Sequence, residues 1–195
     1  MTAILKVDTI QDTSGNNIIN ENANTITIGK SGDTVNLAAG ATNNLGITEA
    51  DQWRLTVMKT DNSDITANLE RNDTNFSLIG SGMSESSGIF TFPQTGIYLI
   101  TAQGRWLSNG SASLYMGVLL LMTTNNSSYV NISNVYESAS TNAYANSYAN
   151  AIVDITNTST HKVKFKRDAE GTQSQLQGDT TTNTTAFTFI RLGDT

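Results

Sequence analysis

The 195-residue sequence predicts an all-β protein, built as an antiparallel sandwich. Short runs of alternating apolar and polar residues recur along the chain, separated by clusters of Gly, Asn, Asp and Ser, which is typical of strands joined by turns. Charged residues make up only 14% of the chain, so Thr, Ser and Asn supply most of its polarity. These residues suit strand faces and turns better than helices.

The most informative stretch is residues 88–100, where two alternating runs meet at a corner. Pro93 is the only proline in the sequence, and Gly96 follows three positions later. Proline holds φ near about −65°, and glycine tolerates the positive φ with which such a corner ends. We therefore predict a strand on each side of Pro93.

The remaining chain after residue 50 contains a regular series of predicted strands. Their ranges are 53–58, 65–69, 76–79, 97–107, 114–123, 129–136, 144–155, 162–167 and 185–192. Residues 114–123 are almost continuously apolar, which predicts a strand buried on both faces. In 162–167, alternation turns Val163 and Phe165 inward and leaves an outward basic row, Lys162, Lys164, Lys166 and Arg167. This row either guards a sheet edge or meets an acidic partner or a polysaccharide.

The first part of the chain is predicted to be an arm rather than an independent domain. We divide the sequence into an arm, residues 1–41, a linker, 42–50, and a head, 51–195. Within the arm, 25–28 and 34–37 flank a five-residue loop and predict a β-hairpin. A segment with so few large side chains cannot bury a core of its own, so we expect it to pack against a partner surface. The candidate attachment residues are Ile4, Leu5, Val7, Ile10, Ile26, Ile28, Val35 and Leu37.

Composition and motifs argue against several functions. The net charge of −6 disfavours nucleic acid as a partner, and the absence of cysteine excludes disulfides and thiol chemistry. No apolar run is long enough for a membrane span, and the first residues lack an export signal, so a soluble protein is expected. His161 is the sole histidine, and Gly29-Lys30-Ser31 lacks the rest of a phosphate-binding loop. We therefore expect a protein that is not an enzyme and that binds no cofactor and no metal.

The acidic residues leave two further functions open, which are action on glycans and calcium binding. Asp168, Glu170 and Asp179 fall in a predicted loop, 168–179, where paired carboxylates can act on glycans, although loop acids are ordinarily only solvated. The same three acids, or alternatively Asp61 and Asp64, carry the oxygen ligands that calcium prefers, although neither group has the spacing of an EF-hand.

Two resemblances refine these expectations. Residues 90–98, an aromatic-x-x-Pro-x-x-Gly-x-Tyr stretch, and the Phe-containing run 185–192 resemble C1q/TNF-like domains. That resemblance implies a jelly roll that forms a homotrimer by packing aromatic and small residues around a threefold axis. Tyr144 and Tyr148 are in phase on one strand face. The candidate trimer-interface residues are Trp106, Tyr115, Tyr144, Tyr148 and His161. For the aromatic residues the alternative is a position in the core, and for His161 it is a polar position at the start of a strand.

Residues 4–15 and 29–35 resemble the N-terminal part of bacteriophage fibre and appendage proteins. This implies a virion surface protein whose arm binds phage capsid or tail proteins. We expect a capsid decoration or head-appendage protein. The alternative is a tail-fibre protein that recognises a host surface glycan or protein, and a polysaccharide-degrading enzyme lacks a convincing acid/base pair.

Overall fold

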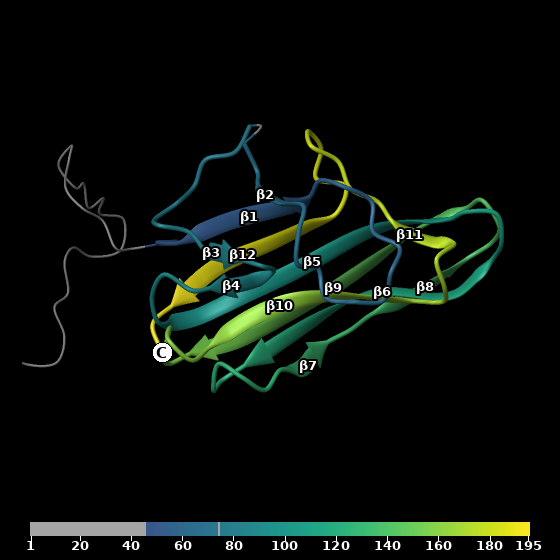
Figure 1. Cartoon of the computed structure of the whole chain (residues 1–195). Helices are drawn as coiled ribbons and strands as arrows, with labels where there is room; N and C mark the ends of the chain where they lie inside the picture. Colours follow the sequence, from purple (N-terminus) through teal and green to yellow (C-terminus); the bar gives the residue numbers. More distant parts are fainter. Residues whose placement is uncertain (1–45, 74) are drawn as a thin grey trace, which may run out of the picture. The chain divides into compact units, whose positions relative to one another are not determined.

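The structure, a computed structural model, describes residues 46–73 and 75–195. Regular structure in this part of the chain consists of strands, arranged as two six-stranded antiparallel sheets (Figure 1). The expected all-β sandwich is therefore confirmed. The predicted arm, with its hairpin and its eight candidate attachment residues, lies outside the described residues, as do residues 42–45 of the predicted linker.

Sheet 1 is centred on its longest strand, β5. The strand β9 pairs with one side of β5, while β12 and then β11 pair with its other side, and β1 and β2 continue the sheet beyond β12. The strands of sheet 1 are β1 (Ala50–Leu55), β2 (Leu69–Arg71), β5 (Gly96–Ser108), β9 (Tyr144–Ile155), β11 (Ser174–Leu176) and β12 (Ala186–Gly193).

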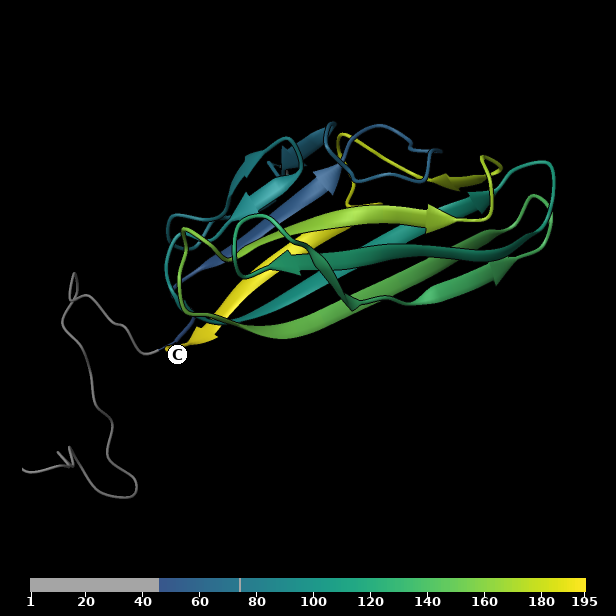
Figure 2. The ribbon, with the colours of Figure 1, turned by 60° about the horizontal axis from the view of Figure 1, so that its bottom comes forward.

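Sheet 2 covers the inner face of sheet 1, and Figure 2 shows β6 and β10 side by side in this second layer. Its order is β3, β4, β10 and β6, after which β7 and β8 both pair with the free side of β6. The strands of sheet 2 are β3 (Ser84–Ser86), β4 (Ile89–Thr91), β6 (Ser113–Thr123), β7 (Val130–Ser133), β8 (Tyr136–Ala139) and β10 (Lys162–Ala169).

The corner at Pro93 carries the chain from sheet 2 into sheet 1, because β4 precedes it and β5 follows it. Gly96 has a φ of +143°, as the corner requires, and a Cβ there would lie 2.5 Å from the carbonyl oxygen of Gly193. The hydroxyl of Tyr98 donates a hydrogen bond of 3.0 Å back to the carbonyl oxygen of Gln94. The corner thus joins the two layers at a fixed point.

Aromatic side chains fill the space between the sheets. The ring of Phe90 from β4 lies 5.5 Å from Trp53, 5.6 Å from Phe165 and 5.1 Å from Phe189, measured between ring centroids. Phe165 from β10 also stacks on Phe187 from β12, with centroids 4.0 Å apart. We call Phe90, Phe165, Phe187 and Phe189 the phenylalanine cluster. All four are buried, so this cluster joins sheet 2 to sheet 1.

Several predicted strands differ from the observed ones. The predicted strand 129–136 is two strands, β7 and β8, because the pairing with β6 is irregular on this edge. Residues 76–79 form only an isolated bridge, in which Ile79 pairs with Ala50. The short strands β3 and β11 were not predicted, since their few residues pair only with strands distant in sequence.

Arg167 corrects the predicted outward basic row. It continues the inward phase of Val163 and Phe165, and its side chain has no exposed surface. The guanidinium lies 5.5 Å from the ring of Trp106 and donates hydrogen bonds to carbonyl oxygens, including that of Gly171 at 2.7 Å. Burial lowers the pKa of Arg167 below its ordinary value. The direction of the Arg167 side chain is therefore set by the alternation along β10 and not by its charge.

The three lysines of the row do point outward, but two of them contact other parts of the chain. Lys162 donates to the hydroxyl of Thr91 at 2.9 Å, and Lys164 pairs with Asp64 at 2.7 Å. The strand that carries them, β10, lies between β6 and β4. A central strand has no free edge, so the row does not guard one.

We expect the substitution Phe90→Ala to lower the free energy of unfolding by about 3–5 kcal/mol, because it empties the centre of the phenylalanine cluster. The adjacent residue gives a matched control, since Ile89 is 37% exposed on the other side of β4. Ile89→Ala is expected to cost less than about 1 kcal/mol. Denaturant unfolding measures both, and equal losses would contradict the assigned core.

Candidate self-association surface

The outer face of sheet 1 carries an apolar row at one end. Leu99 of β5 pairs with Ile152 of β9 on one side and with Ile190 of β12 on the other, and all three side chains point away from the core. Ile152 is 67% exposed, although the rest of its strand alternates regularly with buried residues. A row of three aliphatic side chains on an outer face is unusual for a sheet that meets only water.

Aromatic residues occupy the other end of this face. Tyr144 and Tyr148 are 59% and 51% exposed and pair with Leu107 and Gln103 of β5. The guanidinium of Arg105 lies 4.3 Å from the centroid of the Tyr144 ring, a distance typical of a cation–π contact. This contact holds the Tyr144 ring against the sheet.

Between these ends the outward residues are small and polar, with Thr101 flanked by Asn150 and Thr188. We call Leu99, Tyr144, Tyr148, Ile152 and Ile190 the self-association surface. On the outer faces of β5 and β9 only Arg105 and Asp154 are charged. Exposed aromatic and aliphatic side chains with little charge are characteristic of the centre of a protein interface.

The structure places Tyr144 and Tyr148 on one face, as their spacing predicts. Ile152 continues the same spacing four residues later, so the sequence pattern also indicates its outward direction. Leu99 and Ile190 also have the outward phase of their predicted strands. Which strands are neighbours, however, depends on the sheet order, and the sequence pattern does not contain that order.

The other three candidate interface residues do not lie on the self-association surface, and the first of them is Trp106. Its side chain has no exposed surface, and its indole Nε1–H donates a hydrogen bond of 2.9 Å to the hydroxyl of Ser147. Trp106 alternates with outward Arg105 and Leu107 and therefore belongs to the core. Its expected contact with a partner chain is wrong for this reason.

Tyr115 and His161 lie elsewhere on the molecule. Tyr115 is exposed on the outer face of sheet 2, where its ring lies 5.8 Å from that of Tyr136. His161 lies immediately before β10, and its ring nitrogens contact the hydroxyls of Thr156 and Thr160. The structure thus brings together only two of the five candidate residues.

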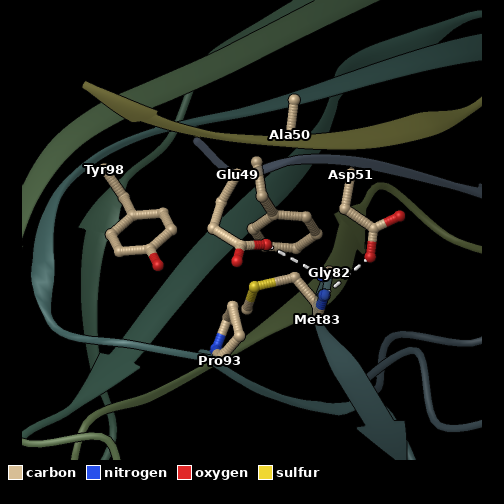
Figure 3. A pocket seen from close by; sticks show the side chains of 8 residues that line it. Glu49, Ala50, Asp51, Gly82, Met83, Pro93 and Tyr98 are labelled. Carbon is tan, nitrogen blue, oxygen red and sulfur yellow. Dashed lines mark hydrogen bonds between the residues drawn. The ribbon is translucent and has the colours of Figure 1, made fainter. Parts of the chain in front are cut away.

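A pair of buried carboxylates lies beside the Pro93 corner, and Figure 3 shows both turned toward the backbone at Gly82 and Met83. Glu49 accepts hydrogen bonds of 2.9 Å from the amides of Ser81 and Gly82. Asp51 accepts one of 2.7 Å from the amide of Met83 and pairs with a guanidinium, that of Arg71, at 3.1 Å. The carboxylates therefore fasten the segment before β3 to β1.

The glycines of this segment explain how the carboxylates fit. Gly80 and Gly82 have φ values of +75° and +70°, and a Cβ at Gly80 would lie 2.3 Å from the carboxyl carbon of Glu49. The space enclosed by Glu49, Asp51, Met83 and the corner has no room for a water molecule. A substrate cannot enter, so this convergence of acids is structural and not catalytic.

Three of the acidic candidates are engaged separately. Asp179 accepts hydrogen bonds from the amides of Thr181 and Thr182 and so forms its own turn. Asp61 pairs with Lys59, and Asp64 pairs with Lys164. Within residues 46–73 and 75–195, no three His, Cys, Asp or Glu side chains are grouped as metal ligands. The same part of the chain contains no helix with the length and apolarity of a membrane span.

We predict an alkaline loss of stability through Tyr98. Burial, followed by the nearby charge of Glu49, raises the pKa of Tyr98 to about 12 from its ordinary value of 10.0. The folded protein keeps this proton where the unfolded chain loses it. The free energy of unfolding should therefore fall by about 2–3 kcal/mol in total as the pH rises from about 10 to 12.

Denaturant unfolding of the wild type and of Tyr98→Phe, measured across this range, tests the assignment. The variant should lose most of this dependence on pH, and at neutral pH it should lose only the hydrogen bond to Gln94, about 1 kcal/mol. Identical pH dependence in the two proteins would refute the role of Tyr98.

Comparison with known proteins shows the fold. The sequence matches no family model, and no curated protein sequence matches it. The structure of Eiger TNF from S. frugiperda superposes with a TM-score of 0.58 at 12% identity, over 75% of this chain and 94% of that one. The crystal structure of murine APRIL at pH 5.0 gives 0.55 at 14% identity, over 74% and 98% of the two chains. The described chain therefore has the TNF-like jelly-roll fold.

Proposed function

We propose that the protein is a non-catalytic binding protein that works as a homotrimer. The observation that carries this proposal is the self-association surface, where Tyr144, Tyr148 and Ile152 are exposed and half-buried Leu99 and Ile190 continue the same face of sheet 1. Burial of apolar surface favours association by about 25 cal/mol for each Å² removed from water, from which the entropy lost on assembly is subtracted. The TNF-like fold supports three as the number of copies, through the trimeric assembly that the C1q/TNF-like resemblance implies.

Threefold assembly requires each chain to contact both of its neighbours. A ring of three copies is closed by contacts between two different patches, one on each flank of every chain. The self-association surface reaches β9, which is the edge strand of sheet 1 and lies beside β7 and β8 of sheet 2. A surface that begins at an edge can face the axis and also contact the neighbouring copy.

The mass of the full chain in solution tests the trimer. We expect three times the mass of one chain at micromolar concentration. The double substitution Tyr148→Glu/Ile152→Glu should weaken the assembly by at least about tenfold, because it buries charges in place of apolar groups. Val130→Glu is the matched control, since Val130 is 61% exposed on sheet 2. A stable wild-type monomer, or equal dissociation by the control, would contradict the proposal.

Within this class, we propose that the protein belongs to a bacteriophage virion, where residues 1–41 hold it on the particle surface. The support is the resemblance of residues 4–15 and 29–35 to phage appendage proteins. Capsid decoration fits a trimeric head with an arm that reaches neighbouring subunits. A tail-fibre protein that binds a host surface glycan is the second candidate, favoured by the exposed polar turns 109–112 and 140–142.

Deletion of residues 1–41 distinguishes the two candidates. For a decoration protein, virions should lose the protein and should be disrupted at a lower temperature than wild-type particles. For a receptor-binding protein, particle stability should not change, while attachment to host cells should fall. Retention of the shortened protein on virions would contradict the assignment of the arm as the anchor.

A further inference from the structure

A β-bulge turns two successive side chains to the outside of sheet 2. Between Ser113 and Met116, β6 contains one residue more than the paired stretch of β8. Leu114 and Tyr115 occupy this bulge, with exposed fractions of 77% and 41%. In a regular strand two neighbours point to opposite faces, so the bulge is what exposes both. Bulges commonly redirect side chains in this way next to functional sites.

A second tyrosine is held beside the bulge by three strands. Tyr136 of β8 and Asp168 of β10 both pair with Gly117 of β6, so they flank a residue that has no side chain. A Cβ at Gly117 would lie 2.7 Å from the Tyr136 ring. The ring therefore crosses the strand, and its hydroxyl donates a hydrogen bond of 2.7 Å to Asp168. The rings of Tyr136 and Tyr115 meet at 84° with their centroids 5.8 Å apart.

Two carboxylates are fixed next to these rings. Asp168 accepts the Tyr136 hydroxyl through Oδ2, and Glu170 accepts the amide of Leu114 through Oε2 at 2.5 Å. In the described part of the chain, no donor is hydrogen-bonded to Oδ1 of Asp168 or to Oε1 of Glu170. Each carboxylate is thus oriented through one oxygen and retains a second for a ligand. Lys166, two residues before Asp168 on the same face of β10, is the opposing charge.

We propose that Leu114, Tyr115, Tyr136, Asp168 and Glu170, here called the tyrosine site, bind a lysine or arginine side chain in a positively charged segment of a partner protein. The electron-rich faces of tyrosine rings attract cations, and carboxylates form strong hydrogen bonds with ammonium and guanidinium groups. Leu114 provides an apolar surface for the aliphatic stem of such a side chain.

Charge and position support this occupant. The site has two carboxylates against one lysine, and the guanidinium of Arg167 points to the opposite, inner side of β10. The tyrosine site is on sheet 2, whereas the self-association surface is on sheet 1. It therefore adds a second binding face to the proposed function and does not depend on the number of copies.

Titration of the full chain with hexa-arginine at about 50 mM salt tests the proposal, because weak exposed contacts are screened at higher ionic strength. With isotope-labelled tyrosine rings, NMR signals of Tyr115 and Tyr136 should shift. Tyr115→Leu and Asp168→Asn should each weaken binding by about fivefold to tenfold. Tyr115→Phe should bind like the wild type, because the ring face is kept. Lys166→Gln should bind more tightly.

A neighbouring carboxylate gives the matched control. Glu137 is exposed on β8, directly after Tyr136, and points to the other side of that strand. Glu137→Gln changes the net charge as Asp168→Asn does, yet it should leave binding unchanged. Equal weakening by the two variants, no shift of the two tyrosine signals, or equal binding of hexa-glutamate would overturn the proposal. Thermal unfolding verifies that each variant is folded.

Discussion

The contact between the two sheets through the phenylalanine cluster is the interaction on which the rest of the structure depends. Phe90 and Phe165 from sheet 2 pack against Phe187 and Phe189 from sheet 1. Because side chains alternate along a strand, an inward phenylalanine determines the direction of its neighbours. Ile190 therefore points outward next to Phe189 and is only half-buried. Each outer surface is a consequence of the register that fills the core.

The two outer faces have different chemistry, and this difference suits different partners. Sheet 1 presents aliphatic and aromatic residues with little charge, which favours a second copy of the same chain. Sheet 2 presents Tyr115 and Tyr136 beside Asp168 and Glu170, which favours a cationic ligand. The two surfaces lie on different sheets, so the proposed assembly and the proposed cationic ligand use different residues.

Stability at the end near the Pro93 corner comes from buried polar contacts as well as from the core. Glu49 and Asp51 bind the amides of residues 81–83, and Tyr98 bonds back to Gln94. The carboxylates satisfy backbone amide donors, and the Tyr98 hydroxyl satisfies a backbone carbonyl acceptor.

Local pattern was sufficient to predict the long strands, β5 and β9 from alternation over ten or more residues and β6 from a continuous apolar run. It also predicted the Pro93 corner and the shared face of Tyr144 and Tyr148. The inward direction of Arg167 follows from the same alternation, but its charge favours an outward position unless the carbonyl groups of Gly171 and Ser174, which the turn after β10 brings beneath it, are known.

The remaining errors have one physical origin, which is that sheet order and bulges are properties of pairing between distant segments. The bulge at Leu114 and Tyr115 depends on β8, and the short strand β11 exists only through its pairing with β5. The row formed by Leu99, Ile152 and Ile190 likewise depends on three strands meeting. No single stretch of sequence contains these relations.

The most direct test of the self-association surface uses the absence of cysteine from this chain, which allows a spin label at any single introduced cysteine. Labels placed by Tyr148→Cys on sheet 1 and by Val130→Cys on sheet 2 report the distances between copies of the assembled protein. The account predicts shorter distances between copies for the label at position 148 than for the label at position 130. The reverse order, or no measurable distance at either position, would contradict it.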